Sequence, residues 1–474
     1  MADWLIDISK NPQARSLIKT LGLPLPLPTP LDREKGPWSA HPLMERKVAV
    51  GASPGAALLA AISRSVAAAG ADPYLDGATD TAAFGEAGEA YGHPPRPVTQ
   101  LRDGERVRAL VFDASGITDV TGLRALYDFF HPAIQRVDRS GRVVVLGRTA
   151  GDSAESSLVA GALDGFVRSV AKEVGRKGAT ANLVLVEPGA ESRLGAVLTF
   201  LMSARSAYVS GQPLSVTLRA KDMGANGTPP VRALDRKVAL VTGAARGIGN
   251  ATARRLALEG AHVVCLDRPA DDGPTAQLAR EIGGTPLALD VTAADAGEKL
   301  LSALRDLGGA DVVVHNAGIT RDKTLAHMKD EQWDQIMAVN LEAVVRLTAA
   351  IEKKALEDGG RVVCLSSIAG LAGNMGQTNY AASKGGVAGY VRGLSPKLAP
   401  RGITVNAIAP GFIETRLTAA IPVAIREVGR RLSALGQGGQ PEDVAQAITF
   451  LASPGAQGLT GQILRVCGGA FIGA

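Results

Sequence analysis

Short apolar runs alternate with segments of helical periodicity along the second half of the chain. Each run has the length of a strand and lacks the polar alternation of a strand with one face in water. Such strands, separated by helices, indicate a parallel sheet covered on both faces, which is the doubly wound α/β arrangement. The predicted strands are residues 237–242, 262–266, 311–315, 361–365, 403–408 and 462–466.

The first half repeats this order with similar stretches. Residues 155–178 align without a gap with residues 379–402. AVGASPGAA parallels VTGAARGIG, FDASGIT parallels HNAGIT, and RVVVL parallels RVVCL, in the same order along the chain. We therefore predict an internal duplication that gives two doubly wound, Rossmann-like α/β domains, the first of them a degenerate copy.

Changes of composition mark the expected boundaries. Residues 20–33 are rich in proline, and residues 220–236 in glycine, proline and charge, which is typical of an arm and of a linker. The predicted organisation is an extended N-terminal arm at 1–40, a degenerate domain at 41–220, a linker at 221–235 and a complete domain at 236–474.

The two copies differ in length at places where open α/β sheets bind ligands. Phe200 lies 11 residues after Gly189, whereas the matching Phe450 lies 39 residues after Gly411. This difference follows the carboxyl end of a strand, so we expect the first copy to have kept a scaffold and lost ligand-facing loops. Residues 415–440 of the second copy are the expected substrate lid.

Composition narrows the class of protein. A chain of 474 residues with 56 glycines and 46% hydrophobic residues suits two α/β domains. Three cysteines in apolar runs indicate buried thiols in a reducing compartment, so a cytoplasmic location is expected, and the histidines show no metal-ligand spacing. No apolar run is long enough to cross a membrane. The net charge of +5 is spread out, with no basic block for nucleic acid, and favours anionic substrates such as nucleotides, CoA or acidic carrier proteins.

A glycine-rich turn, residues 242–249 (TGAARGIG), ends a strand and opens a helix. Glycines there let the backbone approach a phosphate at the helix N-terminus, although packing glycines are a simpler explanation. Asp267 ends the next predicted strand, where a carboxylate can accept ribose hydroxyls and repel a 2′-phosphate. This favours NAD(H), with NADP(H) as the alternative because Arg246 and Arg268 lie nearby in sequence.

Tyr380 and Lys384 lie one turn apart on a predicted helix, hence on one face. A free phenol has a pKa of about 10, and we expect the nearby ammonium to lower it. Ser367 ends the preceding strand and can hydrogen-bond a carbonyl oxygen. A Tyr-x-x-x-Lys pair alone is common on surfaces, but behind the glycine turn and Asp267 it indicates proton transfer coupled to hydride transfer.

These motifs together resemble the short-chain dehydrogenase/reductase family, and within it the 3-oxoacyl-thioester (β-ketoacyl) reductases. The matching stretches are TGAARGIG, Asp290-Val291, HNAGITRD, VNLEAV, LSSIAG, NYAASKGG and NAIAPGFIET, which span 236–474 in the family's order. With the first half included, the whole chain resembles the high-molecular-weight type, whose extra N-terminal domain is flavodoxin-like.

The resemblance implies a catalytic tetrad of Asn340, Ser367, Tyr380 and Lys384. Tyr380 would donate the proton, Ser367 would polarise the carbonyl, Lys384 would tune Tyr380 and hold the ribose, and Asn340 would hold a water, unless it is only a helix-bulge amide. The cofactor-binding residues, with those of the turn, are Gly243, Arg246, Gly247, Ile248, Gly249, Asp267, Arg268, Asp290, Val291, Asn316, Ala317, Gly318, Tyr380, Lys384, Pro410, Gly411 and Ile413.

The first half lacks the matching reactive side chains. Its catalytic positions hold Arg148, Ser156 and Ala160, its third turn glycine is Ala57, and no apolar strand ending in an acid is apparent at 70–76. We therefore expect no catalysis there. Reductases of the family that the chain resembles commonly assemble as tetramers through the helix of the catalytic tyrosine, and the first half keeps small residues on its matching helix. The resemblance therefore implies that the first half replaces a second subunit, so that a homodimer forms a pseudo-tetramer of four Rossmann domains. A ligand of its own, such as an acyl chain or a flavin, is the alternative, although no phosphate-binding signature supports a flavin.

The predicted function is reduction of 3-oxoacyl thioesters of CoA or acyl carrier protein, with NADH favoured. Asp358, beside Arg361 and Arg401, weakens the basic surface on which an acidic carrier would dock, so a CoA thioester is a serious candidate. The alternatives are a dehydrogenase of 3-hydroxyacyl-CoA or of another secondary alcohol, and a nucleotide-binding scaffold without turnover. Pro396 is expected to kink the catalytic helix near Arg392.

Overall fold

The computed structural model describes residues 3–20, 27–77, 79, 82–85, 93–224, 231–419 and 421–470. The chain divides into two units, each with its own sheet. The first unit comprises Met1–Leu218, Leu417–Gly439 and Cys467–Phe471, and the second comprises Arg219–Arg416, Gln440–Val466 and Ile472–Ala474. Residues 225–230 of the expected linker lie outside the described residues.

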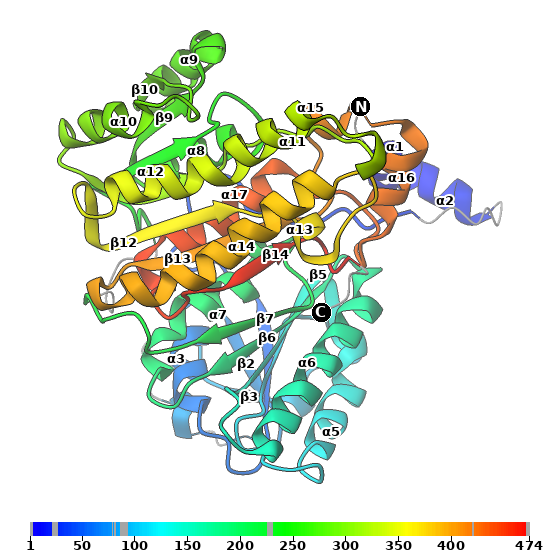
Figure 1. Ribbon diagram of the computed structural model, residues 1–474. Helices are drawn as coiled ribbons and strands as arrows, with labels where there is room; N and C mark the ends of the chain where they lie inside the picture. Colours follow the sequence, from blue (N-terminus) through cyan, green and yellow to red (C-terminus); the bar gives the residue numbers. More distant parts are fainter. Residues whose placement is uncertain are drawn as a thin grey trace. The chain divides into compact units, whose positions relative to one another are not determined.

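The second unit contains a seven-stranded parallel sheet of order β10-β9-β8-β11-β12-β13-β14 (Figure 1). Its strands are β8 (Val238–Thr242), β9 (His262–Asp267), β10 (Thr285–Ala288), β11 (Ala310–His315), β12 (Leu356–Leu365), β13 (Thr404–Pro410) and β14 (Ile463–Val466). The predicted doubly wound fold is confirmed. The sequence pattern missed only β10, whose residues alternate between half-buried and exposed and so form no continuous apolar run.

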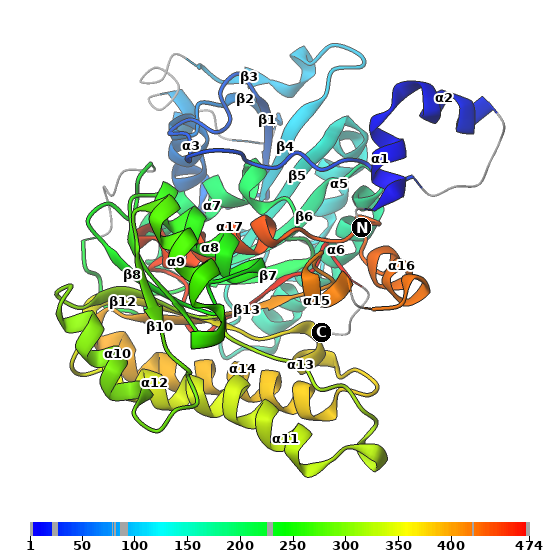
Figure 2. The same ribbon diagram turned by 90° about the horizontal axis from the view of Figure 1, so that it is seen from above.

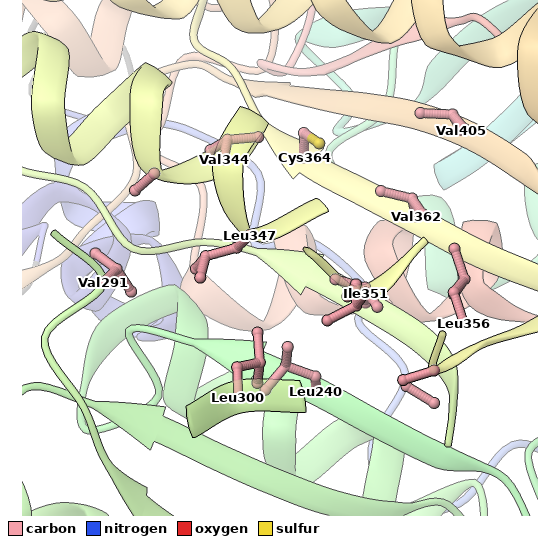
Figure 3. Close-up of a cluster of buried hydrophobic side chains, with 14 of the residues drawn as sticks. Leu240, Val291, Leu300, Val344, Leu347, Ile351, Leu356, Val362, Cys364 and Val405 are labelled. Carbon is pink, nitrogen blue, oxygen red and sulfur yellow. The ribbon is translucent and has the colours of Figure 1, made fainter. Parts of the chain in front are cut away.

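Helices cover both faces of this sheet (Figure 2). On one face lie α8 (Gly247–Leu258), α9 (Asp272–Ile282) and α17 (Pro441–Ala452), and on the other lie α10 (Ala296–Arg305), α12 (Ala343–Ile351) and α14 (Thr378–Leu398). Figure 3 shows how the second layer packs: Leu300, Leu347 and Ile351 lie close to Leu240 and Val362 of the strands. Burial of this apolar surface is the main stabilising force on the layer.

The first unit has the same architecture, with a parallel sheet of order β3-β2-β1-β4-β5-β6-β7. Its strands are β1 (Lys47–Ala52), β2 (Asp72–Leu75), β3 (Arg96–Pro97), β4 (Val107–Asp113), β5 (Val137–Arg148), β6 (Thr180–Val186) and β7 (Gln212–Val216). Its main helices are α3 (Leu59–Ala68) and α7 (Gly195–Met202), which pack together, and α5 (Arg124–Ala133) and α6 (Ala154–Gly175), whose apolar side chains join one core. The two predicted Rossmann-like domains are therefore present.

The expectation that no acid-ended strand occurs at 70–76 is wrong. Strand β2 pairs in parallel with β1, its Tyr74 and Leu75 are buried, and Asp76 follows it directly. Asp72 and Pro73 interrupt the apolar run, which is why the pattern concealed this strand.

Two buried arginines occupy matching positions in the two copies and make the same contact. The Nε of Arg142 in β5 donates to the carbonyl oxygen of Ser203 at 2.9 Å, and the Nε of Arg361 in β12 donates to that of Ser453 at 3.3 Å. The two serines end the matching stretches FLMS and FLAS. Burial lowers the pKa of Arg361 to about 10, so it stays charged at neutral pH. Arg361 therefore supports the fold and is not a surface cation.

The N-terminal residues carry their own structure. Two helices, α1 (Trp4–Lys10) and α2 (Pro12–Thr20), lie within the expected arm. Further along, Asp32 pairs with Arg108 at 2.9 Å, and the guanidinium of Arg205 lies 4.5 Å from the centre of the Trp38 ring. In the part of the chain that the structure describes, we find no helix with the length and apolar character needed to cross a membrane.

Helix α14 continues through Pro396, which lies in its last turn. A proline has no amide proton for the carbonyl of the residue four positions earlier, here Arg392. That carbonyl instead accepts the hydroxyl of Ser395 at 3.3 Å, so the missing backbone bond is replaced locally.

Candidate active site

The glycine turn between β8 and α8 depends on close backbone packing. Gly243 and Gly247 have φ values of +69° and +57°, a region that favours glycine. A Cβ on Gly249 would collide with the carbonyl oxygen of Gly243. The amides of the first helical turn have no intrahelical partner, so this turn can present N–H groups to an anion. Half-buried Ile248 lies in the same turn.

Residues after β11 fix this turn from the neighbouring strand. The Nδ2 of Asn316 donates to the carbonyl oxygens of Thr242 and Gly243, both at 3.0 Å. The Thr242 hydroxyl accepts the backbone amides of Asn316 and Ala317, again at 3.0 Å. Thr242 was not predicted from the sequence, although a hydroxyl at the last position of a buried strand before a glycine turn was a usable signal.

Acidic residues organise the far side of the turn. Asp267, at the end of β9, accepts the amide of Ala245 at 2.8 Å and that of Arg268 at 2.9 Å. The buried carboxylate of Asp271 pairs with Arg246 and, at 2.6 Å, with Arg268. Both arginines that would attract a 2′-phosphate are therefore ion-paired with Asp271. Sequence reasoning missed this carboxylate because it lies in the irregular segment before α9.

The other predicted cofactor residues follow the carboxyl ends of outer strands of the sheet. Asp290 accepts the amide and hydroxyl of Thr292 at 2.9 and 2.7 Å, and these bonds lower its pKa. Val291 packs in the core. Pro410 ends β13, and the amide of Gly411 donates to Val466 at 2.9 Å. Ile413 is also buried. Because all strands run in parallel, these residues and the glycine turn share one edge of the sheet.

The predicted catalytic residues lie at this same edge. Ser367 follows β12 and caps α13 (Ile368–Ala372), where its hydroxyl accepts the amide of Ala369 at 3.2 Å. Tyr380 and Lys384 lie on α14, one turn apart. The Nζ of Lys384 is 5.8 Å from the centre of the Tyr380 ring, so the spacing in the sequence does place the two side chains together.

Lys384 is buried, with a side chain directed back into the sheet. Its Nζ donates to the carbonyl oxygen of Leu365, the last residue of β12, at 2.7 Å. Burial lowers the pKa of Lys384 from its usual value to about 8. Its ammonium is therefore present at neutral pH but is lost under mildly alkaline conditions.

Asn340 lies in a one-turn π-helix, η7 (Ala338–Glu342), and is completely buried. Its Nδ2 donates to the Ile319 carbonyl at 3.0 Å and to the Ser383 hydroxyl at 3.2 Å, while its Oδ1 accepts the Ile319 amide at 2.9 Å. A Cβ on Gly318 would lie 3.3 Å from this Oδ1 and 3.4 Å from the Nζ of Lys384. The absence of a side chain at Gly318 thus leaves room for both Asn340 and Lys384. The bonds of Asn340 fit a helix-bulge amide, and its holding of a water stays a prediction.

The expectation that Lys384 lowers the pKa of Tyr380 does not describe this structure. Burial raises the pKa of the Tyr380 phenol, the nearby Asp322 adds to the rise, and hydrogen bonding with Ser367 opposes it. Sequence spacing indicated proximity to a cation but carried no measure of burial. The phenol is therefore a proton donor at neutral pH, and the serine and tyrosine hydroxyls can together hydrogen-bond one oxygen.

In the first unit, the corresponding turn is filled by protein groups. The carboxylate of Asp113, at the end of β4, accepts the amide of Leu58 just before α3 at 2.7 Å. The Ser115 hydroxyl accepts the amide of Ala57 at 2.8 Å. A Cβ on Gly116 would collide with the carbonyl oxygen of Pro54, so the two loops are in contact. A carboxylate thus takes the place at the helix N-terminus that a phosphate takes in a nucleotide site.

The first unit also differs at the position that matches Ser367. Arg148 ends β5 there and pairs with Glu191 at 2.6 Å. Ser156, which matches Tyr380, has its hydroxyl bonded to the carbonyl of Ser153 at 2.9 Å and to the amide of Gly151 at 2.9 Å. Each of these side chains is therefore bonded to a neighbour within the first unit. The position that matches Lys384 holds Ala160.

Comparisons with known proteins agree on the second half of the chain. The family model described as enoyl-(acyl carrier protein) reductase matches residues 243–470. The 3-oxoacyl-[acyl-carrier-protein] reductase FabG of Vibrio cholerae is 43% identical over 244 residues, 50% of this chain and 99% of that protein. FabG of Escherichia coli is 41% identical over 238 residues, again 50% of this chain and 98% of its own length. The short-chain reductase protein NovJ of Streptomyces niveus is 40% identical over 257 residues, 52% of this chain and 98% of that protein.

The contrast between the two turns predicts one dinucleotide per chain. Isothermal titration calorimetry with NADH should give a stoichiometry of one, because Asp113 and Ser115 already bond the amides at the turn of the first unit, whereas the turn of the second can present its amides to a pyrophosphate. Gly249→Val should abolish the binding by closing that turn. The matched change in the first unit, Ala57→Val, should leave it intact. A stoichiometry of two, or loss of binding in Ala57→Val alone, would contradict this assignment.

Proposed function

Because the chain belongs to the short-chain dehydrogenase/reductase family and is an oxidoreductase, we propose that it reduces 3-oxoacyl thioesters to 3-hydroxyacyl thioesters with a nicotinamide cofactor, NADH being preferred. The observation that carries this proposal is the half-buried phenol of Tyr380, with its raised pKa, beside Lys384 and Ser367 at the carboxyl edge of the sheet. The FabG relatives, named as 3-oxoacyl-[acyl-carrier-protein] reductases, support the substrate class.

The residues divide the work of carbonyl reduction as follows. The bound nicotinamide supplies the hydride. The hydroxyls of Ser367 and Tyr380 hydrogen-bond the ketone oxygen, which orients the substrate and stabilises the negative charge that develops there. Tyr380 gives its proton to that oxygen, and the ammonium of Lys384 stabilises the phenolate that remains. The Lys384 Nζ, bonded to Leu365, is held in place for this role.

The protonated phenol of Tyr380 is the form that reduction of a ketone requires, because the phenol gives its proton to the oxygen of the substrate. The same residues would catalyse the reverse oxidation, so a 3-hydroxyacyl-CoA dehydrogenase is the alternative. The intact arrangement of Ser367, Tyr380 and Lys384 supports an enzyme over a nucleotide-binding scaffold.

Two carboxylates support the preference for NADH. Asp267 already bonds the turn amide of Ala245 and stands at the end of β9, where a ribose is bound in this fold. Asp271 holds Arg246 and Arg268, so neither guanidinium is available to a 2′-phosphate without breaking an ion pair. The carboxylate of Asp267 and the pairing of both arginines with Asp271 are thus the grounds for preferring NADH.

A CoA thioester is favoured over an acyl-carrier thioester as the substrate. Arg361 is buried against Ser453, and Arg401 is bound to Asp358 at 2.6 Å and to the carbonyl of Leu356 at 2.6 Å. Of the two arginines expected to face an acidic carrier, one is therefore internal and the other is neutralised.

We further propose that the first half is a non-catalytic domain that takes the place of a subunit in a homodimer of pseudo-tetrameric form. Among the described residues, nothing lies within 4 Å of a Cβ added to Gly161 or Gly165 of α6, or to Gly389 of α14. The matched glycines Gly165 and Gly389 are thus open in both units, which permits close helix approach. Gly385, the match of Gly161, instead packs against Gly370.

The first test is reduction of acetoacetyl-CoA, followed by the loss of NADH absorbance. The enzyme should turn over, and Tyr380→Phe should lower kcat at least about 100-fold, since the proton donor is removed. NADH affinity, measured by calorimetry, should remain within about twofold in Tyr380→Phe, because the phenol is not the main cofactor contact. Full activity of Tyr380→Phe, or absence of turnover with every 3-oxoacyl thioester offered, would refute the proposal.

Cofactor choice is tested by Asp271→Asn. Freeing Arg246 and Arg268 should shift the ratio of kcat/KM for NADPH to that for NADH by about tenfold toward NADPH, the worth of about one charge-assisted hydrogen bond. The neighbouring exposed Asp272 provides the control, since Asp272→Asn should leave the ratio unchanged. An unchanged ratio in Asp271→Asn would mean that the ion pairs do not set the preference.

The lowered pKa of Lys384 predicts the pH dependence of reduction. The lysine is charged below its folded pKa of about 8 and neutral above it. Because the ammonium stabilises the phenolate formed in the reaction, kcat/KM for the thioester should fall as the pH rises through about 8. The measurement is a profile from pH 6 to 10 at saturating NADH, and a flat profile would remove the charge of Lys384 from the mechanism.

A further inference from the structure

The expected substrate lid has several contacts with residues from the N-terminal half of the chain. The segment leaves the second unit after Arg416, a few residues beyond the carboxyl end of β13, and returns to it at Gln440. Between these points, Leu417–Gly439 groups with Met1–Leu218 in the first unit. The first copy has no equivalent segment of its own, because its chain is 28 residues shorter at the matching place.

A buried ion pair joins the start of the chain to the helix of this segment, α16 (Val423–Arg431). Both carboxylate oxygens of Asp3 accept from Arg431, at 2.8 and 2.9 Å. Asp3 is 5% exposed and also caps α1 by accepting the amide of Leu5 at 3.1 Å. Arg431 reaches further to Glu427, at 3.0 Å, and to the carbonyl of Gly436. One guanidinium therefore links α1, α16 and the loop that follows it.

The end of the segment is held by a second set of bonds. The Nε2 of Gln437 donates to the carbonyl of Thr29 at 2.7 Å, and the hydroxyl of Tyr208 donates to the carbonyl of Gln437 at 2.7 Å. The Tyr208 carbonyl accepts the amide of Gly468 at 2.9 Å. These partners come from the N-terminal arm, from the first domain and from the chain after β14, and they close around the segment.

The two faces of α16 differ in character, as expected of a lid that is held from one side. Arg426 and Arg430 are buried on one face, whereas Ile425 and Val428 on the other face are more than half exposed. A short helix with exposed apolar side chains on one face is not expected to be stable by itself, since short helices are marginal in water. The segment therefore depends on Asp3, Tyr208 and Thr29 for its order.

We propose that Asp3 and Arg431 are positioning residues, which hold the segment 417–439 in the form that binds the thioester substrate. The expected change in KM rests on the proposed function, whereas the expected loss of order in the segment rests only on the contacts described above. When only a fraction of molecules has the lid in its binding form, the apparent affinity falls by that fraction. Loss of the ion pair should thus raise KM for the thioester and leave the chemical step alone.

The test uses Asp3→Asn in the full chain, because asparagine still caps a helix but carries no charge. Hydrogen exchange at residues 423–436, measured by mass spectrometry without ligands, should increase in this variant. KM for acetoacetyl-CoA should rise about tenfold with kcat within about twofold, as expected if about a tenth of the molecules keep the lid in its binding form. Asp7→Asn is the matched control, since Asp7 lies on the same helix in an exposed pair with Lys10 and should change neither quantity.

A double-mutant cycle makes the result specific to the pair. Asp3→Asn with Arg431→Gln should raise KM no more than either change alone, because each removes the same interaction. Unchanged exchange in Asp3→Asn, or increased exchange with an unchanged KM, would overturn the proposal. Should the wild-type protein reduce no 3-oxoacyl thioester, the proposed function fails, while increased exchange confined to 423–436 would still support the anchoring of the segment.

Discussion

The arrangement at the catalytic edge depends on the burial of one lysine. An ammonium removed from water is costly unless it is hydrogen-bonded, and that cost appears as the lowered pKa of Lys384. The lysine is tolerated because β12 ends with the carbonyl of Leu365 directed at its Nζ. The same constraint requires small neighbours: a Cβ on Gly370 would lie 2.6 Å from the backbone at Lys384, and Gly318 occupies the space beside its Nζ. Burial of Tyr380, in turn, keeps its phenol protonated, so the pair is set for proton donation.

The two copies share the same parallel sheet, but the first copy lacks the reactive side chains of the second. Arg142 and Arg361 make the same buried contact in the two units, which is expected of residues that stabilise a scaffold. At the ligand edge the copies diverge, since Asp113 closes the first turn with its own carboxylate where the second turn remains a place for an anion. The first unit has also lost the segment after its sixth strand, yet it supplies the partners that hold the corresponding segment of the second copy.

The sequence patterns predicted those features that depend on continuous apolar runs or on a fixed spacing between residues. The buried strands of the second unit, the duplicated fold and the proximity of Tyr380 to Lys384 were accessible in this way. Strands β2 and β10 were not, because Pro73 breaks the apolar run of one and half-exposed residues alternate in the other. The direction of the pKa shift of Tyr380, the ion pairs of Asp271 and the bond between Asp3 and Arg431 depend on burial and on contacts between distant segments. No local spacing records such contacts, so they required the structure.

The central claim is that Tyr380 is a protonated acid at the pH where the enzyme works. An ultraviolet difference titration of the wild-type protein against Tyr380→Phe isolates this phenol from the other tyrosines. The difference signal of the phenolate should be absent at neutral pH and should develop only above the pKa of a free phenol, about 10. A phenolate signal already present at pH 7 would contradict it, because Tyr380 would then be a base and the proposed direction of proton transfer would be reversed.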